Sequence, residues 1–264
     1  RRRHTRYGTV TGVQTCALPI SAWSIALPEP SFSEPSQLRV AVWADDEFCP
    51  VEADIAAAIT AAGETLAKLG ASVDHSARPA FDPRENHANY LQLLSAVMGA
   101  GMPDSVYEMA VAAVAAADPA DNSDNLQQMR GLAMPHRRWL SANERRLRTQ
   151  ATWHQFFADF DVLLCPVTHV TAFPHDQSAS MADRTLAVDG QFRPYTEVLR
   201  WPGPSLNALL PGTAVPVGLS SNGLPIGLQV VGPYLADRTT LAVAALLEQH
   251  HRGFTPPPGF TADS

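Results

Sequence analysis

Two adjacent serines, Ser220 and Ser221, lie in the glycine-rich stretch GLSSNGLPIGLQVVGP (residues 218–233). A serine acts as a nucleophile when a neighbouring base removes its proton and hydrogen-bond donors stabilise the oxyanion that forms. Serine is also common in turns, where its hydroxyl bonds the nearby backbone. Asn222 and Gly223 follow directly, and an Asn-Gly pair between two β-type runs is a strong hairpin signal. We therefore predict that these serines form a hairpin tip and do not act as nucleophiles.

The only lysine of the chain, Lys68, is the one candidate for the base of a serine–lysine pair. It lies in a predicted helix over residues 51–70, on the side opposite to the apolar residues of that helix. We expect it to face water, where an ammonium group stays protonated at pH 7 and is a poor base. The chain also lacks the GxSxG elbow of serine hydrolases and a Walker-type phosphate loop. The residues alone therefore assign no nucleophile.

Cysteine and histidine offer little further chemistry. Cys16, Cys49 and Cys165 are too few and too widely spaced for a disulfide framework or a CxxC metal site. His169 and His175 are six residues apart in a predicted loop and no HExxH spacing occurs, so we expect no metal. Cys165 lies in an apolar run and is expected to be a buried, inert thiol, with a cysteine hydrolase that uses Cys165 and His169 as a minor alternative. This cysteine usage predicts a reducing, cytoplasmic setting.

The composition is that of a globular protein. The 264 residues are 45% hydrophobic and 17% charged, which suits one large domain or two small ones. The formal net charge of −7 argues against nucleic acid as the main partner. No run of 18 apolar residues occurs, so no membrane span is predicted.

The elements that would position any site begin with a predicted βαβ unit. Residues 38–45 alternate in polarity and are β-branched, as in a strand. The helix over residues 51–70 follows, with Gly70 suited to its C-terminal cap, and residues 71–79 form a second strand. The apolar residues of the helix recur on one face and are Val51, Ile55, Ile59, Ala62, Leu66 and Leu69.

Helices dominate the middle of the chain. Residues 83–130 predict two or three helices, and residues 135–160 predict one long helix. Four apolar residues of the long helix lie roughly on one side, namely Leu140, Leu147, Ala151 and Phe157.

The last third predicts two strand regions and a closing helix. Residues 161–168 are almost all apolar, as in a buried strand, and the proline-rich residues 169–206 predict a long loop. Residues 212–233 predict the serine-bearing hairpin. The helix over residues 236–253 has Asp237 as its expected N-cap.

The N-terminal residues 1–20 differ from the rest of the chain. RRRHTRYGTVTGVQTCALPI resembles the translation of a sequencing-library adapter over its whole length. We therefore expect a non-native segment over residues 1–20, a Pro/Ser-rich linker over 21–37, and the protein domain over 38–264. On this interpretation Cys16 is an artefact, and the gene was cut at a read end, so we expect the true N-terminal portion of the protein to be missing.

Four stretches of the domain resemble one known family. They are LRVAVWADDEFCPVEADI, FADFDVLLCPVT, LNALLPGTAVPVGLSSNGLPIGLQVVGP and TTLAVAALLEQHH. The most specific piece is a spaced frame of nine residues, Asn207, Gly212, Pro216, Gly218, Gly223, Pro225, Gly227, Gln229 and Gly232. Over residues 38–250 the chain resembles the C-terminal half of the amidase signature family.

The resemblance implies an α/β fold in which a mixed β-sheet is layered between helices. It implies hydrolysis of a linear carboxamide to an acid and ammonia or an amine, with no cofactor. The family mechanism uses a serine nucleophile, a second serine that bridges it, and a deeply placed lysine. The region that carries these three residues precedes the strand that begins here near Leu38, so no position of this chain matches them. We therefore assign no catalytic residue, and we expect a truncated fragment that is inactive by itself.

The C-terminal half of the family also supplies one wall of the substrate cleft. By position, the wall candidates are Thr168, His169, Trp201 and Asn207. Each has a purely structural alternative: Trp201 as core packing, Asn207 as a cap or turn residue, and His169 as a loop residue.

The expected partner of the intact enzyme is a small amide, with nucleic acid and membranes excluded and a homodimer left open. The acidic charge makes an aminoacyl-tRNA substrate less favoured. The alternative reading from another functional class is a non-catalytic binding or scaffold protein that keeps the amidase fold.

Overall fold

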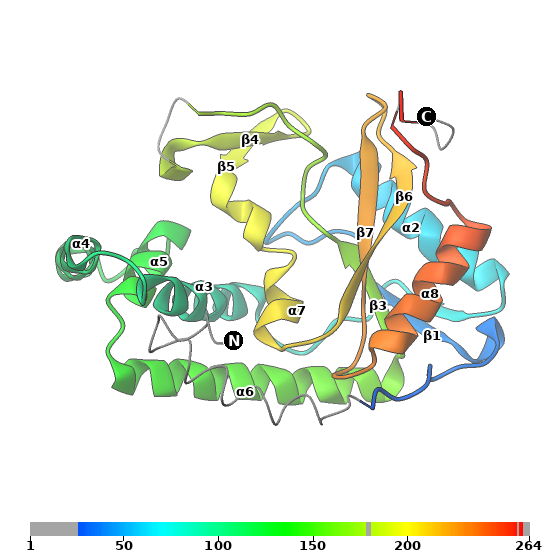
Figure 1. The fold of residues 1–264 in the computed structure, drawn as a ribbon, viewed down its shortest axis with the longest axis horizontal. Coiled ribbons are helices and arrows are strands. Elements are labelled where there is room, and N and C mark those ends of the chain that lie inside the picture. The colour runs from blue at the N-terminus through cyan, green and yellow to red at the C-terminus, as the bar shows by residue number, and fades with distance from the viewer. Residues whose placement is uncertain (1–25, 178–180, 258, 261–264) are drawn as a thin grey trace, which may run out of the picture.

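The structure, a computed structural model, describes residues 26–177, 181–257 and 259–260. Its centre is a five-stranded sheet in the order β2-β1-β3-β7-β6 (Figure 1). The strands are β1 (Arg39–Val42), β2 (Ser72–Asp74), β3 (Val162–Pro166), β6 (Gly212–Leu219) and β7 (Pro225–Val231). β1 pairs in parallel with β2 and β3, whereas β7 is antiparallel to both β3 and β6. The prediction of a mixed sheet is confirmed.

Helices α2 (Ala53–Lys68) and α8 (Asp237–His250) contact each other and pack on β6 and β7. α2 buries the predicted apolar face, including Ile55, Ile59 and Leu66, while Lys68 at its end is exposed as expected. Gly70 has a φ of +103°, which glycine adopts without the steric cost that other residues incur. This conformation turns the chain from α2 into β2 and completes the predicted βαβ unit.

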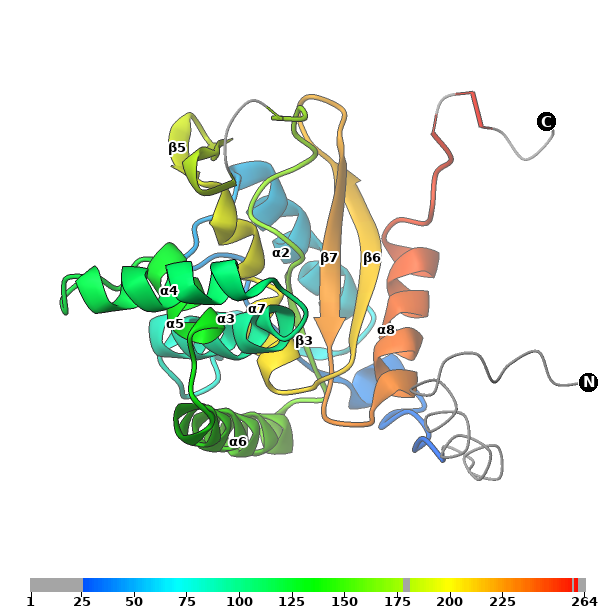
Figure 2. The ribbon, with the colours of Figure 1, turned by 60° about the vertical axis from the view of Figure 1, so that its left-hand side comes forward.

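Four further helices complete this part of the fold: the first three lie on the other side of the β6–β7 hairpin from α8, and the fourth runs along the bottom of the molecule in Figure 1 (Figures 1 and 2). They are α3 (Pro83–Gly99), α4 (Asp104–Ala116), α5 (Asp124–Leu132) and α6 (His136–Asp159). The side chains of Asp82 and Ser123 cap α3 and α5 by accepting backbone N–H groups. A Cβ atom on Gly131 of α5 would lie 2.5 Å from the backbone oxygen of Gln92, so glycine permits the close crossing of α3 and α5.

The long helix α6 buries a different face from the one that its aliphatic residues suggest. Leu140, Leu147 and Ala151 are exposed, and of the four residues grouped from the sequence only Phe157 is buried. The buried residues are Ala142, Trp153, Phe156 and Phe157. Large aromatic side chains bury more apolar area than alanine or leucine, so the cluster of rings at the C-terminal end of α6 determines its orientation.

The prediction of one long loop over residues 169–206 is wrong. The segment contains a two-stranded hairpin, β4 (Thr185–Val188) and β5 (Gln191–Pro194), a 3-10 helix (Tyr195–Leu199) and the short helix α7 (Gly203–Asn207). Asp189 and Gly190 form the hairpin turn with φ values of 47° and 80°. Asp-Gly is a strong hairpin signal that the density of prolines obscured.

The prediction of a hairpin at the adjacent serines is confirmed. β6 and β7 pair in antiparallel register, and Gly223 in their turn has a φ of +77°. The Ser220 hydroxyl oxygen accepts a hydrogen bond from the Leu224 backbone N–H at 3.1 Å. The Ser221 N–H donates to Asp54 Oδ2 at 2.7 Å. Both serines therefore stabilise the turn and its contact with α2.

Two further predictions concern the N-terminal segment and the N-cap of α8. The predicted non-native residues 1–20 lie outside the described residues, as do residues 21–25 of the predicted linker. The remaining linker holds a short 3-10 helix, Pro35–Gln37, and reaches α8 through a hydrogen bond from Ser31 N–H to Thr239 Oγ1. α8 has Ala236 as its N-cap, one residue before the predicted Asp237. In the described parts of the chain, no helix combines the length and the apolarity needed to cross a bilayer.

Candidate functional site

The carboxyl ends of the neighbouring parallel strands β1 and β3 meet at one edge of the sheet. In α/β sheets this edge is the usual position of ligand sites. The loops that follow the two strands are tied together, because Glu52 N–H donates to the His169 carbonyl at 3.0 Å. The Glu52 carboxylate in turn accepts from Thr171 N–H at 2.9 Å. The edge is therefore a fixed platform rather than two independent loops.

Trp201 is anchored beneath this edge. Its indole N–H donates to the Cys49 carbonyl at 3.1 Å, and its ring packs edge-on against Trp43 with a centroid distance of 5.4 Å. The Gln229 side chain donates to the carbonyls of both Pro166 and Trp201. Trp201 is only 5% exposed. These contacts fit the structural alternative given for Trp201, which is a core residue whose N–H has a partner, rather than a residue that faces a substrate.

His169 and Thr168 follow β3 directly. The His169 ring is fully buried, and neither ring nitrogen makes a hydrogen bond to a described residue. Burial, together with the positive charges of Arg193 and Arg200, lowers the pKa of His169 to about 4. The imidazole is therefore neutral at pH 7. Thr168 is half-buried, and its hydroxyl oxygen also finds no partner among the described residues.

Asn207, at the end of α7, belongs to a buried amide pair. Its Nδ2 donates to Asn86 Oδ1 of α3 at 2.7 Å, across 121 residues of chain. Asn207 therefore joins α7 to α3. The five cavities described in this structure are lined by none of the four wall candidates. Their assignment to a substrate wall stays a prediction.

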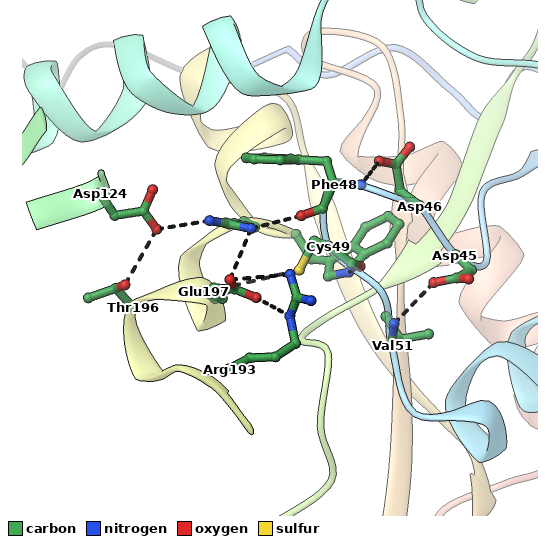
Figure 3. Close-up of polar contacts among 11 residues, drawn as sticks. Asp45, Asp46, Phe48, Cys49, Val51, Asp124, Arg193, Thr196 and Glu197 are labelled. Carbon is green, nitrogen blue, oxygen red and sulfur yellow. Dashed lines mark hydrogen bonds and ion pairs between the residues drawn. The ribbon is translucent and has the colours of Figure 1, made fainter. Parts of the chain in front are cut away.

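A charged cluster that we did not predict lies next to this edge. The Arg200 guanidinium contacts Glu197 Oε1 at 3.1 Å and Asp124 Oδ2 at 3.4 Å, and it donates to the Phe48 carbonyl at 2.7 Å. Arg193 donates to both oxygens of the Glu197 carboxylate. Figure 3 shows how residues of the β1–α2 loop, α5 and the 3-10 helix converge here. The spacing of Arg193, Glu197 and Arg200 by four and three residues is the sequence signal that could have revealed half of the cluster.

Asp124 connects this cluster to α3. His87 Nε2 of α3 lies 3.4 Å from Asp124 Oδ1, and the His87 side chain is 3% exposed. Burial opposes the charged form of Asp124, but His87 and Arg200 outweigh it and lower the pKa of its carboxyl. Asp124 is therefore a carboxylate at neutral pH, held between a histidine and an arginine.

The two described cysteines are buried, free thiols. Burial raises the pKa of Cys165 to about 12, against a smaller opposing effect of Gln229. Burial also raises the pKa of Cys49 to about 12. The thiolate is the nucleophilic form of cysteine, so these surroundings argue against a cysteine hydrolase that uses Cys165.

We expect iodoacetamide to leave Cys49 and Cys165 unmodified in the folded chain at pH 7, because neither forms a thiolate nor reaches solvent. Peptide mass spectrometry after alkylation measures this directly. The control is the same reaction in urea, where both cysteines should be labelled. Labelling of Cys165 at the same rate with and without urea would return the cysteine hydrolase to consideration.

Within the described residues, no group of three His, Cys, Asp or Glu side chains is placed to hold a metal ion. The groups that the edge and the charged cluster do present are arginine, carboxylate and imidazole side chains.

Comparison with known proteins identifies the family whose sequences this chain resembles. The family model described as Amidase matches residues 15–241. A glutamyl-tRNA(Gln) amidotransferase subunit of Brevibacillus brevis is 40% identical over 97 residues, which cover 37% of this chain and 18% of that protein. The indoleacetamide hydrolase of Rhizobium radiobacter is 33% identical over 112 residues, which cover 42% of this chain and 23% of that protein.

Solved structures share the fold. The corresponding glutamyl-tRNA(Gln) amidotransferase subunit from Thermotoga maritima superposes with a TM-score of 0.63 at 21% identity, covering 91% of this chain and 50% of that one. A bacterial aryl acylamidase of the amidase signature family gives a TM-score of 0.57 at 17% identity, covering 81% of this chain and 44% of that one. The chain therefore matches at most half the length of these relatives.

Proposed function

Because the chain belongs to the amidase family, we propose that it takes part in the hydrolysis of a linear carboxamide to a carboxylic acid and ammonia or an amine. The observation that carries this proposal is the family match over residues 15–241. The mixed sheet and the β6–β7 hairpin, which holds most of the glycine and proline frame, support it. The proposal places the protein in the cytoplasm, since both described cysteines are free thiols.

In this proposal, another polypeptide segment supplies the groups that attack the amide. A serine nucleophile needs a base within hydrogen-bonding reach and donors for the oxyanion. Lys68 is exposed at the end of α2, and the oxygen of Ser220 is occupied in a hairpin turn. Ser221 is exposed at the same tip. These positions support a catalytic group that lies outside Lys68, Ser220 and Ser221.

The chain itself would contribute one side of the substrate site. The proposed contributors are the four wall candidates Thr168, His169, Trp201 and Asn207. Because Trp201 and Asn207 are held by Cys49 and Asn86, they would shape the site as rigid parts of the framework. The charged cluster around Arg200 would add polar recognition beside them.

We expect the purified 264-residue chain to release no ammonia from indoleacetamide or from other simple amides above a protein-free blank. The longer reading frame, recovered from source DNA upstream of the codon for Ser21, should hydrolyse an amide through a serine of the added segment. Ammonia detection coupled to glutamate dehydrogenase measures both.

Two outcomes would contradict the proposal. The first concerns where the catalytic groups lie, and the second concerns whether the longer protein is an amidase. Turnover by the 264-residue chain that is lost in Ser221→Ala or Lys68→Ala would place the catalytic groups in this chain. A longer, folded protein that hydrolyses no amide would favour a non-catalytic scaffold with the amidase fold.

A further inference from the structure

A polar pocket of about 410 Å³ opens beside the charged cluster. It is bounded by the β1–α2 loop, the first turns of α3, the start of α5 and the residue that follows the 3-10 helix. The lining residues that bear on ligand binding are Phe48, Arg84, Glu85, His87, Asp124 and Arg200. The close crossing of α3 and α5 at Gly131 brings two of these walls together.

Arg84 is the one strongly basic group of this pocket whose guanidinium has no polar partner among the described residues. It lies on the rim and is exposed, with its guanidinium carbon 4.9 Å from the centroid of the Phe48 ring. Arg200 lies 4.2 Å from the same centroid. A guanidinium that rests on an aromatic ring keeps its N–H groups free in its own plane. Arg84 is thus held in place with its donors unused.

Two buried groups of the pocket are also incompletely bonded. His87 is 3% exposed, and neither of its ring nitrogens makes a hydrogen bond of normal geometry to a described residue. Arg200 Nε is buried and has no partner in the described part of the chain. Buried polar groups normally have partners, so unpaired ones at a pocket wall indicate that a ligand or water completes them.

The carboxylates of the cluster are already engaged. Asp124 is contacted by His87 and Arg200, and it accepts from the Thr196 hydroxyl at 3.4 Å. Glu197 is shared between Arg193 and Arg200. Among the described residues, the unused donors of the pocket are those of Arg84 and Arg200 Nε, and Glu85 on the exposed rim is the one carboxylate of the pocket outside the charged cluster. A planar acceptor with two oxygens matches the guanidinium fork.

We propose that this pocket binds a carboxylate group, and that the amide substrate of the protein carries one. The second clause rests on the function proposed above, whereas the first does not. A singly charged carboxylate is favoured over a phosphate dianion, because Asp124 and the rim residue Glu85 would repel the second negative charge. Phe48 would support the aliphatic part of the ligand beside Arg84.

The test is isothermal titration of the 264-residue chain with three probes. Succinamate carries one carboxylate and one carboxamide, succinamide is its neutral analogue, and inorganic phosphate is the competing anion. Succinamate should bind measurably, whereas succinamide and phosphate should bind at least tenfold more weakly. Equal binding of succinamide would overturn the proposal, and tighter binding of phosphate would replace it with a phosphate site.

Substitution of single arginines tests whether succinamate binds in this pocket. Arg84→Gln should weaken succinamate binding about tenfold or more, because it removes the free guanidinium fork. Arg84 has no polar side-chain partner to lose, so circular dichroism should show an unchanged fold. The matched control is Arg137→Gln, which makes the same charge change at an exposed position of α6 and should leave binding within about twofold. Equal effects of the two substitutions, or no effect of Arg84→Gln, would overturn the proposal.

The readout separates this inference from the proposed function. Binding of succinamate is measured without turnover, so it holds or fails whether or not the longer protein hydrolyses an amide. Hydrolysis of neutral amides only, by a protein that does not bind succinamate, would overturn the carboxylate pocket and leave the amidase function standing.

Discussion

Replacing Trp201 with alanine should lower the free energy of unfolding by about 3–5 kcal/mol, the usual cost of removing a buried tryptophan. The substitution leaves a cavity against Trp43 and removes the N–H donor of the Cys49 carbonyl. The Trp201 backbone still accepts from Gln229, so the loss concerns the side chain alone. Urea denaturation followed by circular dichroism measures the change.

Two control variants separate the cost of losing buried packing at position 201 from the effect of losing an aromatic ring at any position. Trp201→Phe keeps an aromatic ring but loses the hydrogen bond, and it should cost clearly less than Trp201→Ala. Phe192→Ala removes an aromatic ring that is 79% exposed, and it should change stability by less than about 0.5 kcal/mol. A cost for Trp201→Ala as small as that of Phe192→Ala would mean that Trp201 faces an open site and is not a framework residue.

Local sequence signals predicted the elements that are built from neighbouring residues. The β-branched residues at 38–45 and the helical face of α2 predicted the βαβ unit, because both signals depend on one element at a time. β1 is nevertheless buried on both faces over Val40–Val42, so the alternation expected from the sequence is absent there. Asn222 and Gly223 predicted the β6–β7 turn because that turn requires a positive φ angle at one position, which Gly223 supplies. The same logic applied to Asp189 and Gly190 would have predicted β4 and β5.

Contacts between distant segments could not be predicted in this way. Asn207 pairs with Asn86 across 121 residues, and Arg200 contacts Asp124 across 76 residues. No periodicity relates such positions, so the sequence suggested Asn207 as a wall residue and gave no indication of its partner. The face of α6 was also unpredictable from that helix alone, because the packing of Trp153 and Phe157 depends on the segments they meet.

Arg200 and Asp124 illustrate why the charged cluster could not be predicted. Single charged residues in a polar helix are most often solvated, and nothing local marks Asp124 as partly buried or His87 as buried. Burial arises only when α3 and α5 close on the β1–α2 loop. The charged cluster therefore depends on tertiary contacts between residue types that are usually found on the surface.

Lowering the pH from 7.5 to 4 should destabilise the protein by about 3 kcal/mol through His169 alone. The pKa of this histidine falls from its usual value of 6.5 to about 4 in the folded state because of burial, Arg193 and Arg200. The unfolded chain therefore binds the proton first as the pH falls below 6.5. The stabilising effect is complete above pH 6.5 and is lost as the pH falls toward 4. Urea denaturation at pH steps between these values measures the slope.

Other groups also destabilise the protein in acid, since the lowered pKa of Asp124 acts in the same direction. The decisive quantity is therefore the difference between the wild type and His169→Leu, which removes a buried imidazole without hydrogen-bond partners. The variant should be within about 1.5 kcal/mol of the wild type at pH 7.5 and should lose less stability between pH 6.5 and 4. His154→Leu, at an exposed position of α6, is the matched control for the loss of a histidine side chain. Identical slopes for all three proteins would show that His169 takes up its proton as readily when folded as when unfolded, and that water reaches the ring.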